Sequence, residues 1–581
     1  MTRVIALTAA AFLVLSQPIS SPISDASDAG LGRAPGPPAA QQGAESTESA
    51  AAALLEERFI ARENQFLKNV RSYSPRIETY IQNFRPDPEL GSVPTDDHYF
   101  LGRMDFHRGV AVRSFLPQPS LARRILGDLA DPITRFYSMH YQQQPFAYAI
   151  LMDTRRFDRQ HYQFEFVRRE FLGDIRCMVF DVTPRRHAGG GLFRGRIWVE
   201  DQDENIVRFN GTYTSGRTLS SGIHFDSWRE NVQPGLWLPV YVYSEEVDLA
   251  YGVKRTLRFK SETRLWGYDL ARGNRQQELT RMLVDAPAPV RDSSDPAPDP
   301  SPVSRAREWE NQAEVNVLER LEKAGLVAPA GDEVDKVLET VVNNLVLSNH
   351  LDALPPVHCR VLLTAPLESI FVGNTIMISR GLIDVLPDES SLAMILSHEL
   401  GHIVLGHNLT PKNNQYAFHD RLLVPDEELL HHLDLRPTEQ EETAADAKAI
   451  QILKSSPYKD KLSKAGLFLR AMAMTVPRTP ELFGAHLGTR LAQGNQVRRM
   501  ADLMASAPEL QPTRVEQVSA LPLGARIKVD SWNDRIRLVK SKPVTLLSAR
   551  EKMPFEVTPL FPHLTRFSGK VENVREENLN Q

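Results

Sequence analysis

The sequence predicts an α+β protein with an antiparallel, β-barrel-like domain in its N-terminal half and a mainly helical domain in its C-terminal half. Three observations predict this division. Short runs of alternating apolar residues, separated by turn-forming residues, fill much of the first half. Helical spacing of apolar residues prevails in the second half. A Pro-rich, acidic stretch at residues 285–303 has little to bury and is predicted to be a linker between the halves. A chain of 581 residues is also too long for a single hydrophobic core.

The N-terminus has the pattern of an export signal. Arg3 is followed by an apolar run from Val4 to Leu15, which is shorter than the roughly 20 residues that a membrane-spanning helix needs. We therefore assign residues 1–24 as a signal peptide, and residues 25–51, rich in Pro, Ala, Ser and Gln, as a disordered spacer. The protein is expected to be exported, periplasmic or extracellular, with no transmembrane span in the mature chain. An uncleaved anchor and a cytosolic protein with a frayed apolar end are the alternatives.

The β-rich domain is expected over residues 52–284, after one helix from Leu54 to Val70. Arg194 to Glu200 and Ile206 to Gly211 alternate on either side of a turn-like segment, which predicts a hairpin. Many short strands joined by turns indicate an open or closed antiparallel barrel. Further strands are predicted at His161 to Glu170, Asp174 to Val182, Leu238 to Ser244 and Lys254 to Arg264.

Parts of this half resemble the outer-membrane lipoprotein-sorting (LolA/LolB-like) barrel domains. The matching stretches are Phe193 to Glu200, His224 to Trp228 and Gly235 to Pro239, within a resemblance over roughly Tyr73 to Leu270. The resemblance implies a concave sheet that holds lipid acyl chains or lipoproteins. The alternative is a plain β domain that positions the second half or binds protein.

The C-terminal domain is expected over residues 304–530, followed by a tail with possible strands over residues 531–581. Its first helix, Val334 to Ser348, places several apolar residues on one face, Val337 among them. Strands are predicted at Cys359 to Thr364 and Ser369 to Ser379. A second helix is expected from Asp388, whose carboxylate can cap it, to about Gly406.

The second helix carries an HExxH motif, His398-Glu399-Leu400-Gly401-His402. Residues four apart on a helix lie one turn above each other, so both imidazoles point the same way. Two neutral imidazoles can bind one zinc ion, and the intervening Glu399 can serve as general base toward a water on the metal. A helix with merely surface or structurally satisfied histidines is the alternative interpretation.

A third ligand is expected because a catalytic zinc ion usually takes three protein ligands and one water. Glu442 and Asp446 are four apart in a helical segment, so one can bind the metal while the other supports the site. Asp446 can orient a ligand histidine through its second ring nitrogen, or act as a second proton donor. The small residues Ala444 and Ala445 would allow this helix to approach the first one closely. An ordinary acidic helix start is the alternative, but it leaves the Ala-Ala-Asp run unexplained.

Together these motifs resemble the M48 family of zinc peptidases. The resemblance covers Phe371 to Ile450 and includes the strand from Val372, the HExxH motif and the Glu442-x-x-Ala445-Asp446 motif. It implies a gluzincin fold with one Zn²⁺ per chain held by His398, His402 and Glu442. It further implies Glu399 as general base and Asp446 as a supporting or proton-donating carboxylate.

The same resemblance extends to three further residues. Gly373 and Asn374, in the predicted edge strand, are expected to bind an extended peptide substrate. Arg526 keeps the position of a family arginine that stabilises the oxyanion or holds Asp446, although the family's preceding His-Pro is missing. We therefore expect an endopeptidase that acts on proteins or peptides of the cell envelope.

Two other functions stay open. The missing histidine, together with His419 and the His431-His432 pair in the segment between the motifs, is compatible with a latent protease in a chaperone-like or lipid-binding protein. A cytosolic metallohydrolase is the third possibility. The net charge of −5 gives no reason to expect a nucleic-acid partner. His407 is expected to face solvent or to pack at the helix end.

Overall fold

The fold is known from a computed structural model. It describes residues 39–87, 91–106, 110–116, 143–153, 157–186, 188–214, 223–248, 256–268, 270, 314–351, 354–407, 430, 435–494, 496–509, 527–529, 536–538 and 566. The predicted signal peptide and the whole of the predicted linker lie outside these ranges. The chain divides into two compact units, residues 1–54 and residues 55–581.

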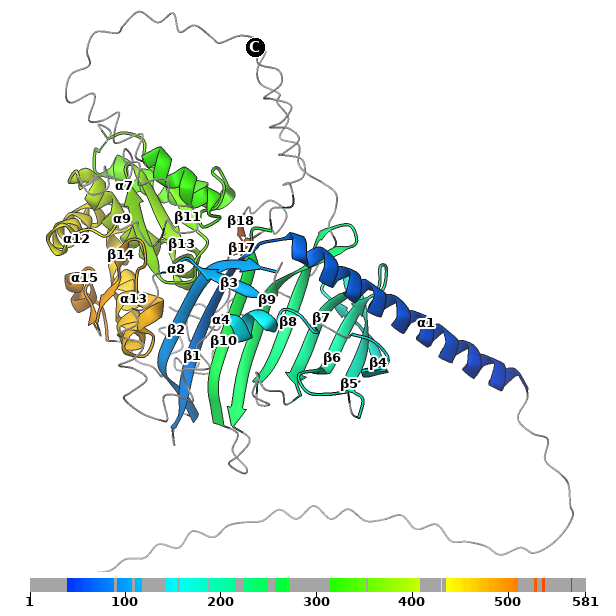
Figure 1. The fold of residues 1–581 in the computed structure, drawn as a ribbon. Helices are drawn as coiled ribbons and strands as arrows, with labels where there is room; N and C mark the ends of the chain where they lie inside the picture. The colour runs from blue at the N-terminus through cyan, green and yellow to red at the C-terminus, as the bar shows by residue number, and fades with distance from the viewer. Residues whose placement is uncertain are drawn as a thin grey trace, which may run out of the picture. The chain divides into compact units, whose positions relative to one another are not determined.

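The N-terminal half forms one ten-stranded antiparallel sheet (Figure 1). The strand order is β3-β2-β1-β10-β9-β8-β7-β6-β5-β4, so β1 and β10 pair while β3 and β4 lie at the two edges of an open sheet. This confirms the predicted fold class. The strands are β1 (Arg76–Asp87), β2 (Gly91–Asp105), β3 (Ala111–Ser114), β4 (Tyr162–Leu172), β5 (Ile175–Pro184), β6 (Phe193–Glu200), β7 (Ile206–Tyr213), β8 (Ile223–Gln233), β9 (Leu236–Asp248) and β10 (Thr256–Trp266).

The predicted hairpin is present as β6 and β7, which pair in antiparallel register. By contrast, the strands β1, β2, β3 and β8 were not predicted. In β1 the polar side chains of Thr79 and Gln82 are fully buried, as is most of Glu78. A strand covered on both faces does not show the simple apolar and polar alternation from which strands are predicted.

Helix α1 (Ala39–Asn69) begins within the stretch expected to be a spacer and ends close to the predicted position. From Leu55 onward its apolar side chains pack on one face of the sheet. Phe59 and Phe66 belong to the same core as Phe180 and Phe209. A short helix, α4 (Gln143–Tyr148), and a 3-10 turn, Val70–Ser72, complete the described part of this half.

The C-terminal half packs helices around a four-stranded sheet with the order β11-β13-β12-β14. Most of the predicted apolar face of the first helix is buried, but Val337 is 42% exposed and does not belong to it. The elements are α7 (Glu333–Ser348), β11 (His358–Leu362), β12 (Glu368–Val372), β13 (Thr375–Ser379), α8 (Arg380–Val385), α9 (Glu389–Val404), α12 (Glu439–Lys454), α13 (Leu462–Thr475), α14 (Pro480–Phe483), β14 (Thr489–Arg490) and α15 (Ala501–Ser506).

Smaller elements follow or connect these. Two 3-10 turns lie at Lys459–Lys461 and Val476–Arg478. The two-residue strands β15 (Ala492–Gln493) and β16 (Gln496–Val497) form a hairpin, and β17 (Ile527–Val529) pairs with β18 (Ile536–Leu538). Strand β18 lies in the predicted C-terminal tail, where strands were expected. None of the helices in the described ranges combines the length and apolar character that crossing a bilayer requires.

The predicted strand from Ser369 to Ser379 is a hairpin instead. Gly373 and Asn374 form the tight turn between β12 and β13, because Gly373 adopts the left-handed backbone (φ 58°) that a turn requires. Glu314 holds this turn, since its carboxylate accepts hydrogen bonds from the backbone N–H of Asn374 (3.1 Å) and the hydroxyl of Thr375 (2.6 Å).

The two halves share one buried junction. Tyr99 and Trp266 of the sheet belong to the same hydrophobic core as the helices of the C-terminal half. Glu78 and Arg380 form a buried ion pair (2.9 Å), and the Asp97 carboxylate accepts hydrogen bonds from the first backbone N–H groups of α14, both at 2.8 Å. The sheet therefore supports the strands on which the site described next depends.

Candidate metal centre

The helix that carries the HExxH motif is anchored by its cap and by its burial. The Asp388 carboxylate accepts a hydrogen bond from the Ser391 backbone N–H at the start of α9, as predicted. His398, Glu399 and His402 are all fully buried. Because buried polar groups need partners, the surroundings of these three side chains determine what the site can do.

Helix α12 approaches α9 closely, which brings a carboxylate to the imidazoles. A Cβ atom added at Gly401 would lie 2.8 Å from the carbonyl oxygen of Ala445, so the two backbones nearly touch. Ala445 is fully buried, whereas Ala444 is exposed; only the second of the two predicted small residues makes this contact. Thr438 and Glu441 form a capping box that fixes the start of α12.

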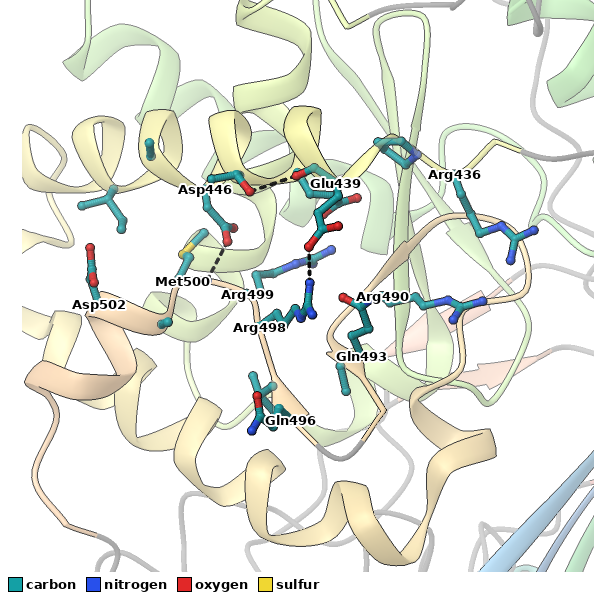
Figure 2. A pocket seen from close by; sticks show the side chains of 18 of the residues that line it. Arg436, Glu439, Asp446, Arg490, Gln493, Gln496, Arg498, Arg499, Met500 and Asp502 are labelled. Atoms are coloured by element: carbon teal, nitrogen blue, oxygen red, sulfur yellow. Dashed lines mark hydrogen bonds and ion pairs between the residues drawn. The ribbon is translucent and has the colours of Figure 1, made fainter.

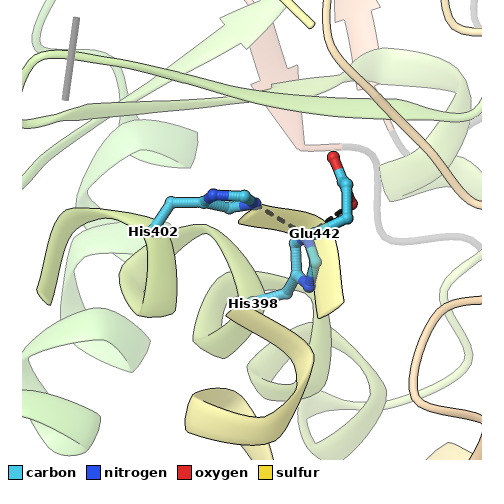
Figure 3. Close-up of side chains that lie close together, drawn as sticks. All are labelled: His398, His402 and Glu442. Atoms are coloured by element: carbon cyan, nitrogen blue, oxygen red, sulfur yellow. Dashed lines mark hydrogen bonds and ion pairs between the residues drawn. The ribbon is translucent and has the colours of Figure 1, made fainter. Parts of the chain in front are cut away.

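Three candidate ligand atoms converge between these helices (Figure 3). The Nε2 atoms of His398 and His402 are 3.2 Å apart, and Glu442 Oε2 is 3.3 Å from His398 Nε2. Ligands bound to one tetrahedral zinc ion at about 2.0–2.1 Å lie about 3.3 Å from each other, because that is the edge of the tetrahedron. The donor set and these two distances therefore fit zinc, and all three ligand atoms lie within 4.8 Å of one another.

His398 is oriented by a carboxylate on its second ring nitrogen. Asp446 Oδ1 lies 2.7 Å from His398 Nδ1, and Asp446 Oδ2 accepts a hydrogen bond from the Met500 backbone N–H (2.9 Å). Burial and the charge of Arg499 lower the pKa of His398, but its hydrogen bonds with Asp446 and Glu442 outweigh them and raise it overall. With a proton on Nδ1, Nε2 is left as a lone-pair donor for a metal ion.

His402 is paired with a second histidine instead of a carboxylate. Its Nδ1 lies 2.9 Å from Nδ1 of His407, and its ring stacks on Phe371 with 4.6 Å between ring centroids. As one of the two expectations had it, His407 packs at the helix end, and the turn after α9 also folds its ring back toward His402. Burial and the charges of His398 and His407 hold the pKa of His402 far below its usual range, so the ring is neutral, as a metal ligand must be.

The general-base candidate, Glu399, contacts two residues that the sequence did not indicate. Ser369 donates a hydrogen bond to Glu399 Oε1 (2.5 Å), and the Arg499 guanidinium lies 3.6 Å from the same oxygen while donating to Ser369 Oγ (2.9 Å). Burial raises the pKa of the Glu399 carboxyl, although the charges of His398 and Arg499 oppose this. Within the described ranges Glu399 Oε2 has no hydrogen-bond partner, which leaves it for a reacting group.

The other predicted site residues either lie outside the described residues or belong to the β12–β13 turn. Arg526 lies outside the described residues, as do His419, His431 and His432. Gly373 and Asn374 belong to the β12–β13 turn and not to a strand, so an extended peptide would pair with the preceding strand. Substrate binding by these two residues stays a prediction.

A cavity of about 620 Å³ opens beside the centre (Figure 2). One wall is the start of α12, including Glu442 and Asp446, and the other is the segment from Gly488 to Asp502. The cavity is large enough for several side chains of a ligand. Charged and amide side chains line much of it, among them Arg436, Glu439, Arg490, Gln493, Gln496 and Arg498.

A comparison with protein families agrees with this geometry. Residues 339–419 match the model of peptidase family M48, and this stretch includes α9 with both histidines. The match supports a metallopeptidase domain in the C-terminal half. No curated protein matches the chain.

Two solved structures are similar to part of the chain at low identity. A DUF1329 family protein from Desulfovibrio piger has 11% identity and a TM-score of 0.18, over 37% of this chain and 94% of that one. A domain from Vibrio parahaemolyticus, described as an outer-membrane lipoprotein-sorting protein domain, has 11% identity and a TM-score of 0.22, over 39% of this chain and 98% of that one. These scores are too low to carry an argument about ligands.

Proposed function

We propose that this chain, whose residues 339–419 match peptidase family M48, is a zinc-dependent endopeptidase. The observation that carries the proposal is the convergence of two imidazole nitrogens and the Glu442 carboxylate at the spacing of zinc ligands, beside a buried glutamate. His398, His402 and Glu442 would hold the ion. Zinc, when bound, supplies a Lewis acid that activates water and polarises a carbonyl group near neutral pH.

The chain's own residues supply proton transfer. Glu399 takes the proton of the attacking water on its Oε2 and passes it to the leaving amine of the substrate. Arg499 and Ser369 hold Glu399 Oε1, so the carboxylate keeps one orientation. Asp446 fixes the tautomer of His398 and is a positioning residue in this scheme. The role predicted for Arg526 stays part of the proposal.

The peptide would bind along β12. Its residues 370–372 pair with β13 on one side, whereas β14 covers only Glu368 and Ser369 on the other side. Gly488 lies against Ile370, so in the described part of the chain it is the second edge of Phe371 and Val372 that offers backbone groups to an extended substrate. Phe371 lies in this stretch and stacks on His402, so a peptide added there would run past the metal ligands.

We further propose that the substrates are cell-envelope proteins, because the sequence begins with the pattern of an export signal. The alternative, a lipid- or lipoprotein-binding protein with a latent protease, requires an apolar space on the sheet. In the described residues, one face of the sheet is instead packed by the chain's own Phe59, Phe66 and Phe157. This favours a supporting role for the sheet.

The test is cleavage of casein by the purified full chain beside Glu399→Gln and a chelator-treated sample. We expect Glu399→Gln to keep one zinc ion by elemental analysis and to lose at least about 100-fold in rate, because only the general base is removed. Glu442→Ala should lose the metal itself. Equal cleavage by all samples, or native protein without zinc, would contradict the proposal.

A further inference from the structure

We infer that one face of the ten-stranded sheet binds the chain's own Pro-rich C-terminal segment, residues 553–567, in an extended polyproline-type conformation anchored by Arg566. The tryptophan face, as we name this binding surface, consists of Trp198, Trp228, Trp237 and Tyr241. The inference does not depend on the proposed peptidase activity.

The tryptophan face is buried, although the described ranges contain nothing that covers it. Trp198 points away from α1, because its neighbour Ile197 belongs to the core that contains Phe59 of α1, and neighbours in a strand point to opposite faces. Among the described residues, the apolar cluster around the tryptophans draws on β4 to β9 only. The three tryptophans are nevertheless at most 6% exposed. A single sheet layer cannot bury its own outer face, so another part of the chain is needed to cover it.

Arg566 indicates which part of the chain reaches this face. Its guanidinium donates a hydrogen bond to Glu200 Oε2 (2.7 Å) and lies 3.5 Å from Asp201 Oδ1. The Glu200 side chain is fully buried, so this charge-assisted hydrogen bond is shielded from water. Glu200 follows Trp198 by two residues in β6, which places both side chains on one face about 7 Å apart. Arg566 is thus held at the margin of the tryptophan face.

The sequence before Arg566 has the composition that aromatic surfaces bind. It reads Met-Pro-Phe-Glu-Val-Thr-Pro-Leu-Phe-Pro-His-Leu-Thr from residue 553 to residue 565, with prolines at 554, 559 and 562. Proline favours the polyproline II conformation, which loses little conformational entropy on binding and packs its rings on aromatic side chains. Four residues of polyproline II span roughly 12 Å, and the strand spacing places Trp228 at about the same distance from Glu200. Pro562 can therefore lie over Trp228 while Arg566 keeps its contact.

One row of cross-strand neighbours joins the tryptophan face to the junction with the C-terminal half. The row runs over Glu78, Arg264, Tyr241, Trp228, Arg208 and Trp198. At its first end Glu78 pairs with Arg380 of α8, and β17 contacts α8. The chain that follows β17 and β18 must reach Glu200 beside the other end, where Arg566 binds. The direct course between these ends would cross the tryptophan face.

Two features of the face suit a bound peptide. The Arg208 guanidinium carbon lies 4.3 Å and 4.2 Å from the ring centroids of Trp198 and Trp228, and Asp226 holds this guanidinium through two hydrogen bonds of 2.8 Å. Both indole rings are thereby fixed as rigid platforms. Trp237 Nε1 is buried and has no acceptor among the described residues. A polyproline-type segment has no internal hydrogen bonds, so one of its carbonyl groups can accept from Trp237.

Hydrogen exchange measured on the full chain tests the docking. The Glu399→Gln background prevents any self-cleavage. We expect the backbone amides of residues 555–567 to exchange at least about tenfold more slowly than those of a synthetic peptide of the same sequence. Arg566→Glu should abolish this protection, because the new carboxylate is repelled by Glu200 and Asp201. Arg575→Glu, with the same charge change nine positions further along, is the matched control and should retain it.

A second variant separates the polyproline mode from the ion pair. Changing Pro559 and Pro562 together to Ala leaves Arg566 in place and should lower the protection, because the rings and the preorganised backbone are lost. Thermal unfolding of each variant checks that the sheet stays folded. Unprotected amides at residues 555–567 in the parent chain, or equal protection in both the Arg566→Glu and the proline variants, would overturn the inference.

A labelled peptide of residues 553–567 identifies the occupant. It should bind the full-length Arg566→Glu variant, whose own segment has left the face, and change its tryptophan fluorescence. The parent chain should bind it at least about tenfold more weakly, because its tethered segment competes at high effective concentration. Equal binding by both proteins would contradict an occupied face. Protection that rises with protein concentration would assign the face to the segment of a second copy and overturn the intramolecular docking.

Discussion

His402 and His407 meet through their Nδ1 atoms, 2.9 Å apart, and only one of the two nitrogens can carry the proton. If His402 is to give its Nε2 lone pair to a metal ion, its proton must sit on Nδ1. His407 must then accept the hydrogen bond and carry its own proton on Nε2. His407 therefore fixes the ligating tautomer of His402, as Asp446 does for His398.

Replacing His407 should weaken zinc binding without removing a ligand. We expect His407→Leu to raise the Kd for zinc by about 10- to 100-fold, because the tautomer and the orientation of His402 are no longer held. His407→Gln keeps an acceptor and should recover part of the loss. The measurement is competition with a chromophoric chelator, with the thermal unfolding midpoint of each variant as control. Equal zinc affinity of His407→Leu and the wild type would refute the role.

The two histidines of the candidate metal centre could be predicted from the sequence because helix geometry places residues four apart on one face. A second helical motif predicted Glu442 and Asp446 as candidates, and the family resemblance implied Glu442 as the ligand. The partners of Glu399 could not be predicted in this way. Ser369 and Arg499 lie 130 residues apart, and only the tertiary fold brings them to the same carboxylate. The short-range contact of His407 was missed because its side chain turns back after the helix ends at Val404.

At the scale of elements, the site depends on the distance between α9 and α12. Gly401 and Ala445 bring the two backbones together, and Glu442 lies three residues before Ala445 on the same helix. A larger side chain at this contact would push the helices apart. The carboxylate would then move away from the imidazoles.

We expect Ala445→Leu to destabilise the protein by about 1–3 kcal/mol or more, because a close-packed contact is overfilled. Zinc content should fall together with stability. Ala444→Leu is the matched control, since Ala444 is exposed and its replacement should change stability by about 0.5 kcal/mol or less. Denaturant unfolding and elemental analysis check both. If Ala445→Leu bound zinc with native stability, the close approach would not limit the site.

The boundaries of some elements could not be predicted for a local reason. Both β12 and β13 are entirely buried, so the run from Ser369 to Ser379 is apolar on either side of its turn. The pattern of apolar residues then indicates strand structure, but it does not show where the chain reverses direction. Gly373-Asn374 is the turn signal within this run, but the apolar residues on both sides of it favour a single continuous strand.

For the whole molecule, the junction between the halves contains several buried carboxyl groups. Burial raises the pKa of Glu368 to about 7, although its hydrogen bonds from the Leu487 and His486 backbone N–H groups oppose this. Burial likewise raises the pKa of Glu78 to about 7 and that of Asp97 to about 6. These groups bind protons in the folded state at pH values where the unfolded chain has lost them.

Stability should therefore fall as pH rises from about 5 to 8. The folded pKa of Glu368, about 7, exceeds its unfolded value near 4.5, so its stabilising contribution is complete below pH 4.5 and is lost as pH rises through 7. Glu368 contributes at most roughly 3 kcal/mol to the free energy of unfolding. The midpoint of thermal unfolding should fall as pH rises. It is measured with a chelator present, so that zinc binding does not contribute to the pH dependence. Glu368→Gln should make this dependence on pH less steep.

The exposed Glu319→Gln is the control for charge alone, because its side chain is 63% exposed. This variant should keep the wild-type slope. A wild-type midpoint that rises between pH 5 and 8, or an unchanged slope in Glu368→Gln, would contradict the assignment.

The two halves could be predicted from the sequence, but this junction could not. Its hydrogen bonds join residues hundreds of positions apart, such as Asp97 and Glu481.

Met500 and Arg499 follow α12 in the sequence, and their contacts complete the candidate site. The HExxH helix is complete at Val404, yet Asp446 receives its backbone partner only from Met500, and Glu399 its cation only from Arg499. A chain folded only as far as α12 would thus hold the three candidate metal ligands, but Asp446 would lack its backbone partner and Glu399 its cation. The proposed peptidase activity would therefore begin only once the segment that contains Arg499 and Met500 has folded against α9 and α12.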